Sequence, residues 1–193
     1  MINSNLLIII GPSGVGKSSI LNDVMENCDD LVVHPTYTTR PIRKNETSKF
    51  NEHIFLSDEE FDKLESNNEF IEVVQLFELP YRYGLKKIKA EKGKLNIVML
   101  RQSVMGLMQK HYPGGIVYQI EADYEKVGHR LKQRTRKGDN LGTRLKIYDD
   151  EIRKGREIAN RIIKNNTTLR VASFDFIDNL NKDFAYLKYG IIE

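Results

Sequence analysis

Eight residues near the start of the chain, GPSGVGKS from Gly11 to Ser18, have the spacing of a loop that binds phosphate groups. They match the pattern G-x-x-x-x-G-K-[ST], in which glycines let consecutive backbone N–H groups point at one anion. Lys17 could reach the β and γ phosphates of a nucleotide, and the hydroxyl of Ser18 could bind Mg²⁺. We therefore predict that this segment binds a nucleoside triphosphate. The expected binding residues are Gly11, Ser13, Gly14, Val15, Gly16, Lys17, Ser18 and Ser19.

A second stretch with chemical potential is TYTTRPIRKNE, from Thr36 to Glu46. Arg40 and Arg43 lie three positions apart in it, with a proline between them that stiffens the loop. Two guanidinium groups in this arrangement could close on one phosphate, although two solvated arginines in a basic loop would give the same pattern. Later stretches add Glu72 in FIEVVQ and Tyr83 in YRYG as further polar candidates.

The elements that position the phosphate loop are a strand before it and a helix after it. Asn5 to Ile10 is a short apolar run typical of a buried strand, and Lys17 to Met25 has the apolar spacing of a helix. The loop therefore has the context that the motif requires, and the helix presents its positive end to the bound anion.

The rest of the chain alternates between strand and helix patterns, which predicts an α/β domain with a parallel sheet and an insertion near residues 34–90. Leu31 to Thr39 is expected to be a strand. Ser57 should cap a helix, with Glu60 completing a capping box, because each can bond the other's backbone N–H. Further strands are expected at Ile54–Leu56, Phe70–Phe77, Leu95–Leu100 and Gly115–Ile120, and helices at Ser103–His111, Tyr124–Arg134, Arg144–Ile158 and about Phe176–Leu187. The polar stretch TRKGDNLGT, residues 135–143, is expected to be a mobile loop.

Composition limits the class of protein. With 193 residues, 40% hydrophobic and 30% charged, the chain should fold as one domain. The apolar run from Leu6 to Ile10 is too short to span a membrane, and the single cysteine, Cys28, fits a reducing cytoplasm. The stretch from Glu125 to Lys164 contains thirteen Lys or Arg residues and six Asp or Glu residues. Charge alone does not distinguish a nucleic-acid patch, a solvated helix face and a cover for an anionic ligand.

Taken in order, these motifs resemble the guanylate kinase family over nearly the whole chain. The resemblance rests on GPSGVGKSS, TTRPIR with Glu46, HIFLS, EEF, NNEFIE, YRYG, RLKQR and a later RL followed by Glu151. It implies a P-loop NTPase-type parallel sheet flanked by helices, with core residues 1–33 and 91–193, an inserted acceptor-binding subdomain at about 34–90 and a basic lid at about 130–150. It also implies transfer of the γ-phosphate of ATP, with Mg²⁺, to a nucleoside monophosphate.

The resemblance also assigns roles to side chains. Arg40, Arg43 and Tyr83 would hold the acceptor phosphate, Thr36 and Glu72 would face the base, and Arg134 and Arg144 would come from the lid. A carboxylate such as that of Glu72 can accept two N–H bonds from a guanine edge. Lid arginines would neutralise charge on the group in transfer, which needs little covalent help from the protein.

Three departures from the family pattern concern the acceptor. His53 replaces a tyrosine of a Y-x-F element, and Leu85 replaces a Ser or Thr that contacts the base. Met99 and Arg101 stand where the family has two aspartates, one of which helps to read the guanine amino group. If Arg101 lines the acceptor pocket, GMP should bind poorly and a more anionic acceptor should be favoured. Arg101 could instead point to solvent at the strand end.

The sequence therefore favours a nucleoside monophosphate kinase with a GMP-like acceptor and altered base recognition. One alternative resembles ribose 1,5-bisphosphate phosphokinase, whose extra acceptor phosphate would suit Arg101, although Glu72 would repel it. Another is an inactive interaction module with the kinase fold, which the intact Lys17 and Ser18 argue against. His34 and His53 are expected to be partly buried strand residues. No nucleic-acid or membrane partner is expected, and the sequence does not predict the oligomeric state.

Overall fold

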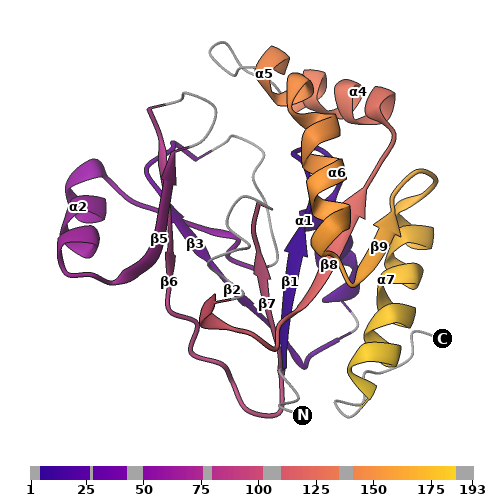
Figure 1. Ribbon diagram of the computed structural model, residues 1–193, viewed down its shortest axis with the longest axis horizontal. Helices are drawn as coiled ribbons and strands as arrows, with labels where there is room; N and C mark the ends of the chain where they lie inside the picture. Colours follow the sequence, from indigo (N-terminus) through magenta and orange to yellow (C-terminus); the bar gives the residue numbers. More distant parts are fainter. Residues whose placement is uncertain are drawn as a thin grey trace.

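The computed structural model describes residues 5–26, 28–42, 50–75, 80–101, 110–134 and 141–185. Its centre is a parallel sheet in the strand order β2-β7-β1-β8-β9 (Figure 1). The strands of this sheet are β1 (Leu6–Ile10), β2 (Leu31–His34), β7 (Leu95–Met99), β8 (Ile116–Glu121) and β9 (Arg161–Lys164). The parallel α/β architecture predicted from the alternating pattern is confirmed.

β1 is buried along its whole length, as expected for a central parallel strand covered on both faces. Leu7 and Ile9 pack in a cluster with apolar residues of α1 (Lys17–Val24) and α7 (Leu169–Asp183). The alternate residues of β1 pack on the other face with Leu85 of a second sheet. The strand that leads into the phosphate loop is thus fixed from both sides.

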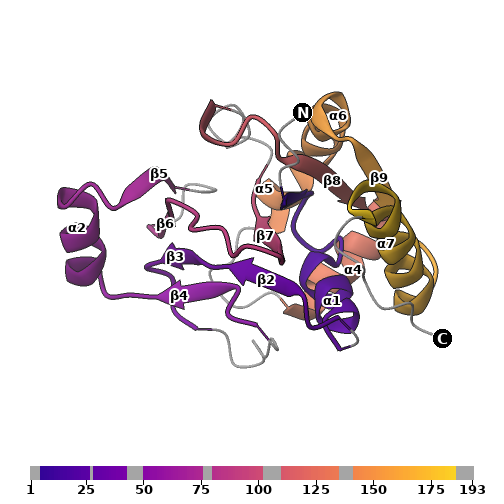
Figure 2. The same cartoon turned by 90° about the horizontal axis from the view of Figure 1, so that it is seen from below.

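The second sheet lies beside the first and has the strand order β4-β3-β6-β5 (Figure 2). It contains one parallel pair, β3 with β4, and two antiparallel pairs. The strands are β3 (Thr36–Thr38), β4 (His53–Phe55), β5 (Phe70–Gln75) and β6 (Arg82–Lys86). All of them come from residues 36–86, inside the segment that the sequence predicted as an insertion.

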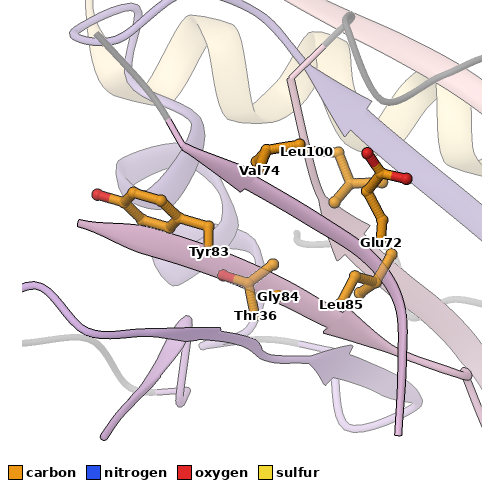
Figure 3. Close-up of a pocket in the computed structure, with 7 residues that line it drawn as sticks. All are labelled: Thr36, Glu72, Val74, Tyr83, Gly84, Leu85 and Leu100. Carbon is orange, nitrogen blue, oxygen red and sulfur yellow. The ribbon is translucent and has the colours of Figure 1, made fainter. Parts of the chain in front are cut away.

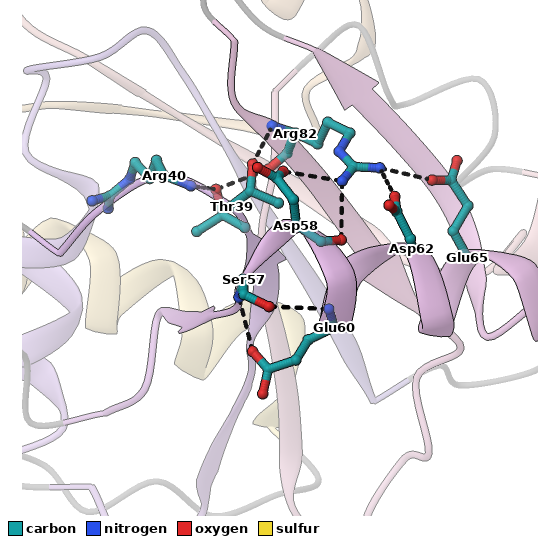
Figure 4. Close-up of polar contacts among 9 residues, drawn as sticks. Thr39, Arg40, Ser57, Asp58, Glu60, Asp62, Glu65 and Arg82 are labelled. Carbon is teal, nitrogen blue, oxygen red and sulfur yellow. Dashed lines mark hydrogen bonds and ion pairs between the residues drawn. The ribbon is translucent and has the colours of Figure 1, made fainter.

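Helix α2 (Asp58–Ser66) packs at the outer end of the second sheet and begins with the predicted capping box. The Ser57 hydroxyl accepts a bond from the Glu60 N–H at 3.2 Å, and the Glu60 carboxylate accepts one from the Ser57 N–H at 2.8 Å (Figure 4). Two of the otherwise unpaired N–H groups at the helix start are satisfied in this way. The sequence prediction for this helix start is confirmed.

Arg82 connects β6 to this helix. Its guanidinium donates to the carboxylates of Asp58 at 3.1 Å and Glu65 at 3.3 Å, and it also contacts Asp62 (Figure 4). The same group lies 4.6 Å from the centre of the Phe61 ring. Arg82 therefore has a structural role, because its contacts hold α2 against β6.

The stretch from Leu31 to Thr39, predicted as one strand, forms two strands in different sheets. β2 ends at His34 and β3 begins at Thr36, with Pro35 between them. Proline has no N–H to donate to a strand ladder, so the pairing of β2 with β7 stops there and the chain crosses to the second sheet. The strand propensity was predicted correctly, but the change of sheet was not.

The helix predicted over Arg144 to Ile158 is two helices, α5 (Leu141–Lys146) and α6 (Tyr148–Ile158). A new helix begins after Ile147, and its first turn carries the acidic residues Asp149, Asp150 and Glu151. Acidic side chains favour a helix N-terminus, so these residues were a signal for the break that the sequence prediction did not use. Residues 141–143, predicted as loop, belong to α5, and the rest of that predicted loop lies outside the described residues.

The last helix, α7, begins at Leu169, seven positions before the predicted start at Phe176. The Thr168 hydroxyl caps it by accepting a bond from the Val171 N–H at 3.3 Å. Helix α4 (Tyr124–Arg134) has the predicted bounds. The helix predicted over 103–111 lies outside the described residues except for its last two positions, which are helical.

Two further observations concern membrane-spanning helices and the single cysteine. Within the described ranges, no helix is long and apolar enough to cross a membrane. Cys28 is buried, and burial raises the pKa of its thiol, which is typical of a packing residue and not of a reactive thiol.

Candidate functional site

The phosphate loop follows β1 at the carboxyl end of the central sheet, where ligands of open α/β sheets bind. Gly16, at the start of α1, has a φ of 105°, which residues with a side chain rarely adopt. A Cβ at Gly16 would also lie 2.2 Å from the side-chain nitrogen of Asn165. The glycine is therefore required both by the backbone conformation and by a side chain packed behind the loop.

Two residues that the sequence motifs did not mark hold the loop from behind. The Asn165 amide donates to the Val15 carbonyl at 2.8 Å. Arg130 of α4 donates to the carbonyls of Val15 at 3.2 Å and Asn165 at 3.3 Å. Two of these three bonds are accepted by the Val15 carbonyl of the loop, so they support the loop without occupying any of its N–H groups. Arg130 lies in the basic stretch from Glu125 to Lys164, whereas no sequence pattern marks Asn165.

Lys17 lies across the phosphate loop. Its ammonium group donates to the carbonyls of Gly11 at 2.7 Å and Pro12 at 3.2 Å. Desolvation lowers the pKa of Lys17 to about 8, and Glu52 is the largest opposing influence. Arg101 acts in the same direction as desolvation, and Glu151 opposes it. A triphosphate would offer this lysine stronger acceptors than the loop carbonyls do.

Arg101 extends toward the phosphate loop from the end of β7. Its guanidinium lies 2.8 Å from the Glu151 carboxylate and 3.4 Å from the Ser13 hydroxyl. The two charged side chains are 17% and 6% exposed, so the possibility that Arg101 simply points to solvent is wrong. Burial raises the pKa of Glu151, and the charges of Arg101 and Lys17 oppose that rise. The result is a partly desolvated ion pair beside Ser13.

A chain of contacts runs from the phosphate loop to the second sheet. The Ser18 hydroxyl donates to the Glu52 carboxylate at 2.6 Å, and the other oxygen of that carboxylate lies 3.6 Å from Nε2 of His53. Nδ1 of His53 lies 2.6 Å from the Thr36 hydroxyl. His53 is partly buried, as expected, and so is His34, which contacts Asn96 at 2.8 Å. Glu52 was not selected from the sequence, since only its neighbour His53 lay in a recognised motif.

A pocket of about 40 Å³ lies on the second sheet, where three predicted acceptor residues meet (Figure 3). Thr36 of β3, Glu72 of β5 and Tyr83 of β6 all line it. The other lining residues are Val74, Gly84, Leu85 and Leu100. Arg101 is absent from the lining although Leu100 is present, because the next side chain along the chain turns to the phosphate loop.

An irregularity in β5 helps to place Glu72 in this pocket. Phe70 pairs with Lys86 and Glu72 pairs with Leu85, so two steps along β5 match one step along β6. Such a bulge reorients the side chains that follow it, and bulges are frequent beside active sites. Glu72 and Leu85 thus lie opposite each other in the ladder and line the same pocket.

The predicted arginines have different surroundings. Arg40 is buried at 5% exposure, its guanidinium lies 4.9 Å from the centre of the Phe55 ring, and it donates to the Pro41 carbonyl at 3.2 Å. Arg134 is the last residue of α4, and Arg144 lies in α5. Arg43 is outside the described residues. The remaining predicted loop residue, Ser19, lies in the first turn of α1.

Comparison with known proteins agrees with this geometry. Residues 3–177 match the family described as guanylate kinase. A guanylate kinase of Rhodopirellula baltica is 33% identical over 84% of this chain and 83% of its own length. One from Clostridium perfringens is 30% identical over 76% of this chain and 69% of its own.

A solved structure shows the same fold. The crystal structure of guanylate kinase from Anaplasma phagocytophilum superposes with a TM-score of 0.67 at 21% identity, covering 95% of this chain and 88% of that one. The expected P-loop NTPase-type fold is therefore confirmed. With a family match that spans most of its length, the chain belongs to the guanylate kinase family.

Proposed function

We propose that the protein is an ATP-dependent kinase that transfers the γ-phosphate, with Mg²⁺, to a nucleoside monophosphate, and that its acceptor is GMP or resembles it. The observation that carries this proposal is the pocket that unites Thr36, Glu72 and Tyr83 on the second sheet. The phosphate loop follows β1 of the central sheet, and Ser18 beside it contacts Glu52, which precedes β4 of the second sheet. The proposed donor and acceptor sites therefore lie on two sheets that adjoin each other.

In this proposal, residues 1–33 and 91–193 form the core, about 34–90 the acceptor-binding part and about 130–150 the lid. Lys17 exchanges the loop carbonyls for phosphate oxygens and, protonated at neutral pH, stabilises charge on the group in transfer. Arg134 and Arg144 act from the lid in the same way. Bound Mg²⁺ would be held by the Ser18 hydroxyl and would neutralise phosphate charge.

We assign Arg101 to the donor phosphates instead of the acceptor. Its guanidinium is close to Ser13 of the phosphate loop, and Glu151 holds it there. The ribose bisphosphate alternative depended on Arg101, because this cation was expected to lie in the acceptor pocket. That support is lost, because the pocket lining includes Glu72 but not Arg101.

In this proposal the Glu72 carboxylate and the Thr36 hydroxyl, from the pocket lining, offer polar contacts to a base. Arg40, Arg43 and Tyr83 would hold the acceptor phosphate. Leu85 supplies an apolar surface beside Glu72. We therefore expect base recognition to depend on Glu72 more than on any hydroxyl at position 85.

The test is ADP release measured against a panel of nucleoside monophosphates and ribose 1,5-bisphosphate. GMP should give the highest kcat/KM. In Arg40→Ala, the KM for the acceptor should rise roughly ten- to a hundredfold, with little change in the KM for ATP. Turnover with the ribose phosphate alone, or no turnover with any acceptor, would replace this proposal by the sugar-phosphate kinase or the inactive module.

A further inference from the structure

One carboxylate beside the second sheet contacts the phosphate loop and has no role in the proposed function. Glu52 precedes β4, and its side chain accepts the hydrogen of the Ser18 hydroxyl at 2.6 Å. We propose that Glu52 is a metal-binding residue that, together with Ser18, coordinates the divalent cation accompanying the nucleotide. The proposal rests on the proposed function in that it needs a bound nucleoside triphosphate, but it does not depend on the acceptor.

The spacing of the two oxygen atoms suits adjacent positions around Mg²⁺. Mg²⁺ binds oxygen ligands at about 2.0–2.1 Å in octahedral geometry, which places neighbouring ligand oxygens roughly 3 Å apart. The carboxylate oxygen and the hydroxyl oxygen need to separate by only a few tenths of an ångström from their present 2.6 Å. A small shift of the Glu52 side chain is sufficient.

The number of ligands also suits Mg²⁺. Within the described residues, no group of three or more His, Cys, Asp or Glu side chains could form a metal site built from protein ligands alone. Mg²⁺ does not need one, because it retains several waters and is usually held by one or two carboxylates plus substrate phosphates. Glu52, Ser18 and the β and γ phosphates would form such a set.

The charges around Lys17 identify Glu52 as the carboxylate for this role. Glu52 and Glu151 are the carboxylates that act on Lys17 electrostatically. Glu151 already forms its ion pair with Arg101 at 2.8 Å. The Glu52 carboxylate, in contrast, touches the hydroxyl that the motif assigns to the metal.

His53 lies between this carboxylate and the acceptor pocket. Nε2 of the ring lies 3.6 Å from one oxygen of Glu52, and Nδ1 lies 2.6 Å from the hydroxyl of Thr36, which lines the pocket. The proposed cation site and the acceptor pocket are thus joined through Glu52, His53 and Thr36.

The test measures Mn²⁺ binding by electron paramagnetic resonance, with a non-hydrolysable ATP analogue bound and no acceptor present. In Glu52→Gln, Mn²⁺ affinity of the complex should fall by at least the roughly tenfold typical of losing even an outer-shell partner. Affinity for the metal-free analogue should remain equal or rise, because a negative charge near the phosphates has been removed. A purely structural role for Glu52 would weaken both affinities together.

Two further variants complete the test. Glu52→Asp keeps the carboxylate and should restore part of the Mn²⁺ affinity, which also covers the case in which Glu52→Gln fails to fold. Glu69→Gln, which removes an exposed carboxylate paired with Lys86, is the matched control and should change neither affinity. Unchanged Mn²⁺ affinity in Glu52→Gln would overturn this proposal alone. Failure of the unaltered protein to bind the analogue would overturn the proposed function as well.

Discussion

The guanidinium of Arg101 lies 2.8 Å from the carboxylate of Glu151, and both side chains are largely buried beside the phosphate loop. The pair joins the end of β7 to α6 and holds a positive charge close to Ser13. The structure therefore allows two roles for Arg101, one in stability and one in phosphate binding, and substitutions can separate them.

In Arg101→Met, Glu151 is left without its cation, so we expect a loss of about 3 kcal/mol in unfolding free energy together with weaker ATP binding. The double variant Arg101→Met, Glu151→Gln removes both charges and should recover most of the stability but not the ATP affinity. Urea unfolding and calorimetric titration with ATP measure the two quantities. Recovery of both in the double variant would show that Arg101 serves only the ion pair.

Lys17→Ala should lower turnover by at least two orders of magnitude while the protein remains folded. The variant removes a charge that stabilises the transferring phosphoryl group. Within the described residues, the Lys17 ammonium group donates hydrogen bonds to two carbonyls of the loop, so its loss should leave the rest of the fold intact. Single-turnover kinetics and circular dichroism measure the two effects. Near-normal turnover would favour the inactive interaction module over the kinase.

Leu85→Thr should improve GMP recognition, because it places a hydroxyl opposite Glu72 in the pocket. One added hydrogen bond corresponds to a KM for GMP lower by roughly two- to tenfold. Thermal stability should fall at the same time, since Leu85 is 3% exposed and packs in an apolar cluster. Val74→Thr adds a hydroxyl elsewhere in the same pocket and is the matched control. An unchanged KM would place the base away from position 85.

Asp183→Asn should destabilise the protein at neutral pH but not in acid. Asp183 at the end of α7 accepts two bonds from Arg161, at 2.6 and 2.9 Å, and one from the Tyr118 hydroxyl at 2.8 Å. These contacts, led by the bond from Arg161, lower the pKa of the Asp183 carboxyl. A carboxyl with a lowered folded-state pKa stabilises the fold above its ordinary pKa, and this contribution is lost as the pH falls through the folded-state value.

We therefore expect a difference of about 1 kcal/mol between Asp183→Asn and the unaltered protein at neutral pH, because Arg161 is partly exposed and solvent screens the pair. The difference should shrink as the pH falls below the ordinary carboxyl pKa and through the lower folded-state value. Urea unfolding at neutral and at acid pH provides the measurement. Asp178→Asn, which breaks an exposed pair with Lys182, should cost a few tenths of a kcal/mol at most and serves as control. A constant difference at all pH values would contradict the role of the charge.

The features predicted best from the sequence are those that depend on residues close together in the chain. The phosphate loop could be predicted because Gly11, Lys17 and Ser18 have a fixed spacing, and the capping box because Ser57 and Glu60 are three apart. Element ends were less predictable. Leu31 to Thr39 was predicted as one strand although Pro35 lies within it, and the change of sheet there depends on pairing partners that lie far along the sequence.

Contacts between distant segments account for what the sequence did not reveal at the site. Glu52 lies 34 positions from Ser18, and Asn165 lies 150 positions from Val15. No local pattern encodes such approaches. For Arg101, the strand-end position was predicted correctly, yet the direction of its side chain depends on Glu151, a residue of a helix packed near the loop.

The crossing at Pro35 also has a consequence for how acceptor specificity could evolve. Since the chain leaves the central sheet after His34 and enters the second at Thr36, the segment 36–86 is continuous and could be replaced by recombination as one block. Such a block meets the donor half at the contact of Glu52 with Ser18 and at Leu85, which packs with the alternate residues of β1. An incoming block would have to match the donor half at both places, with an acidic residue at the first and an apolar one at the second, so acceptor specificity is inherited as a module most readily from parents that share these two residues.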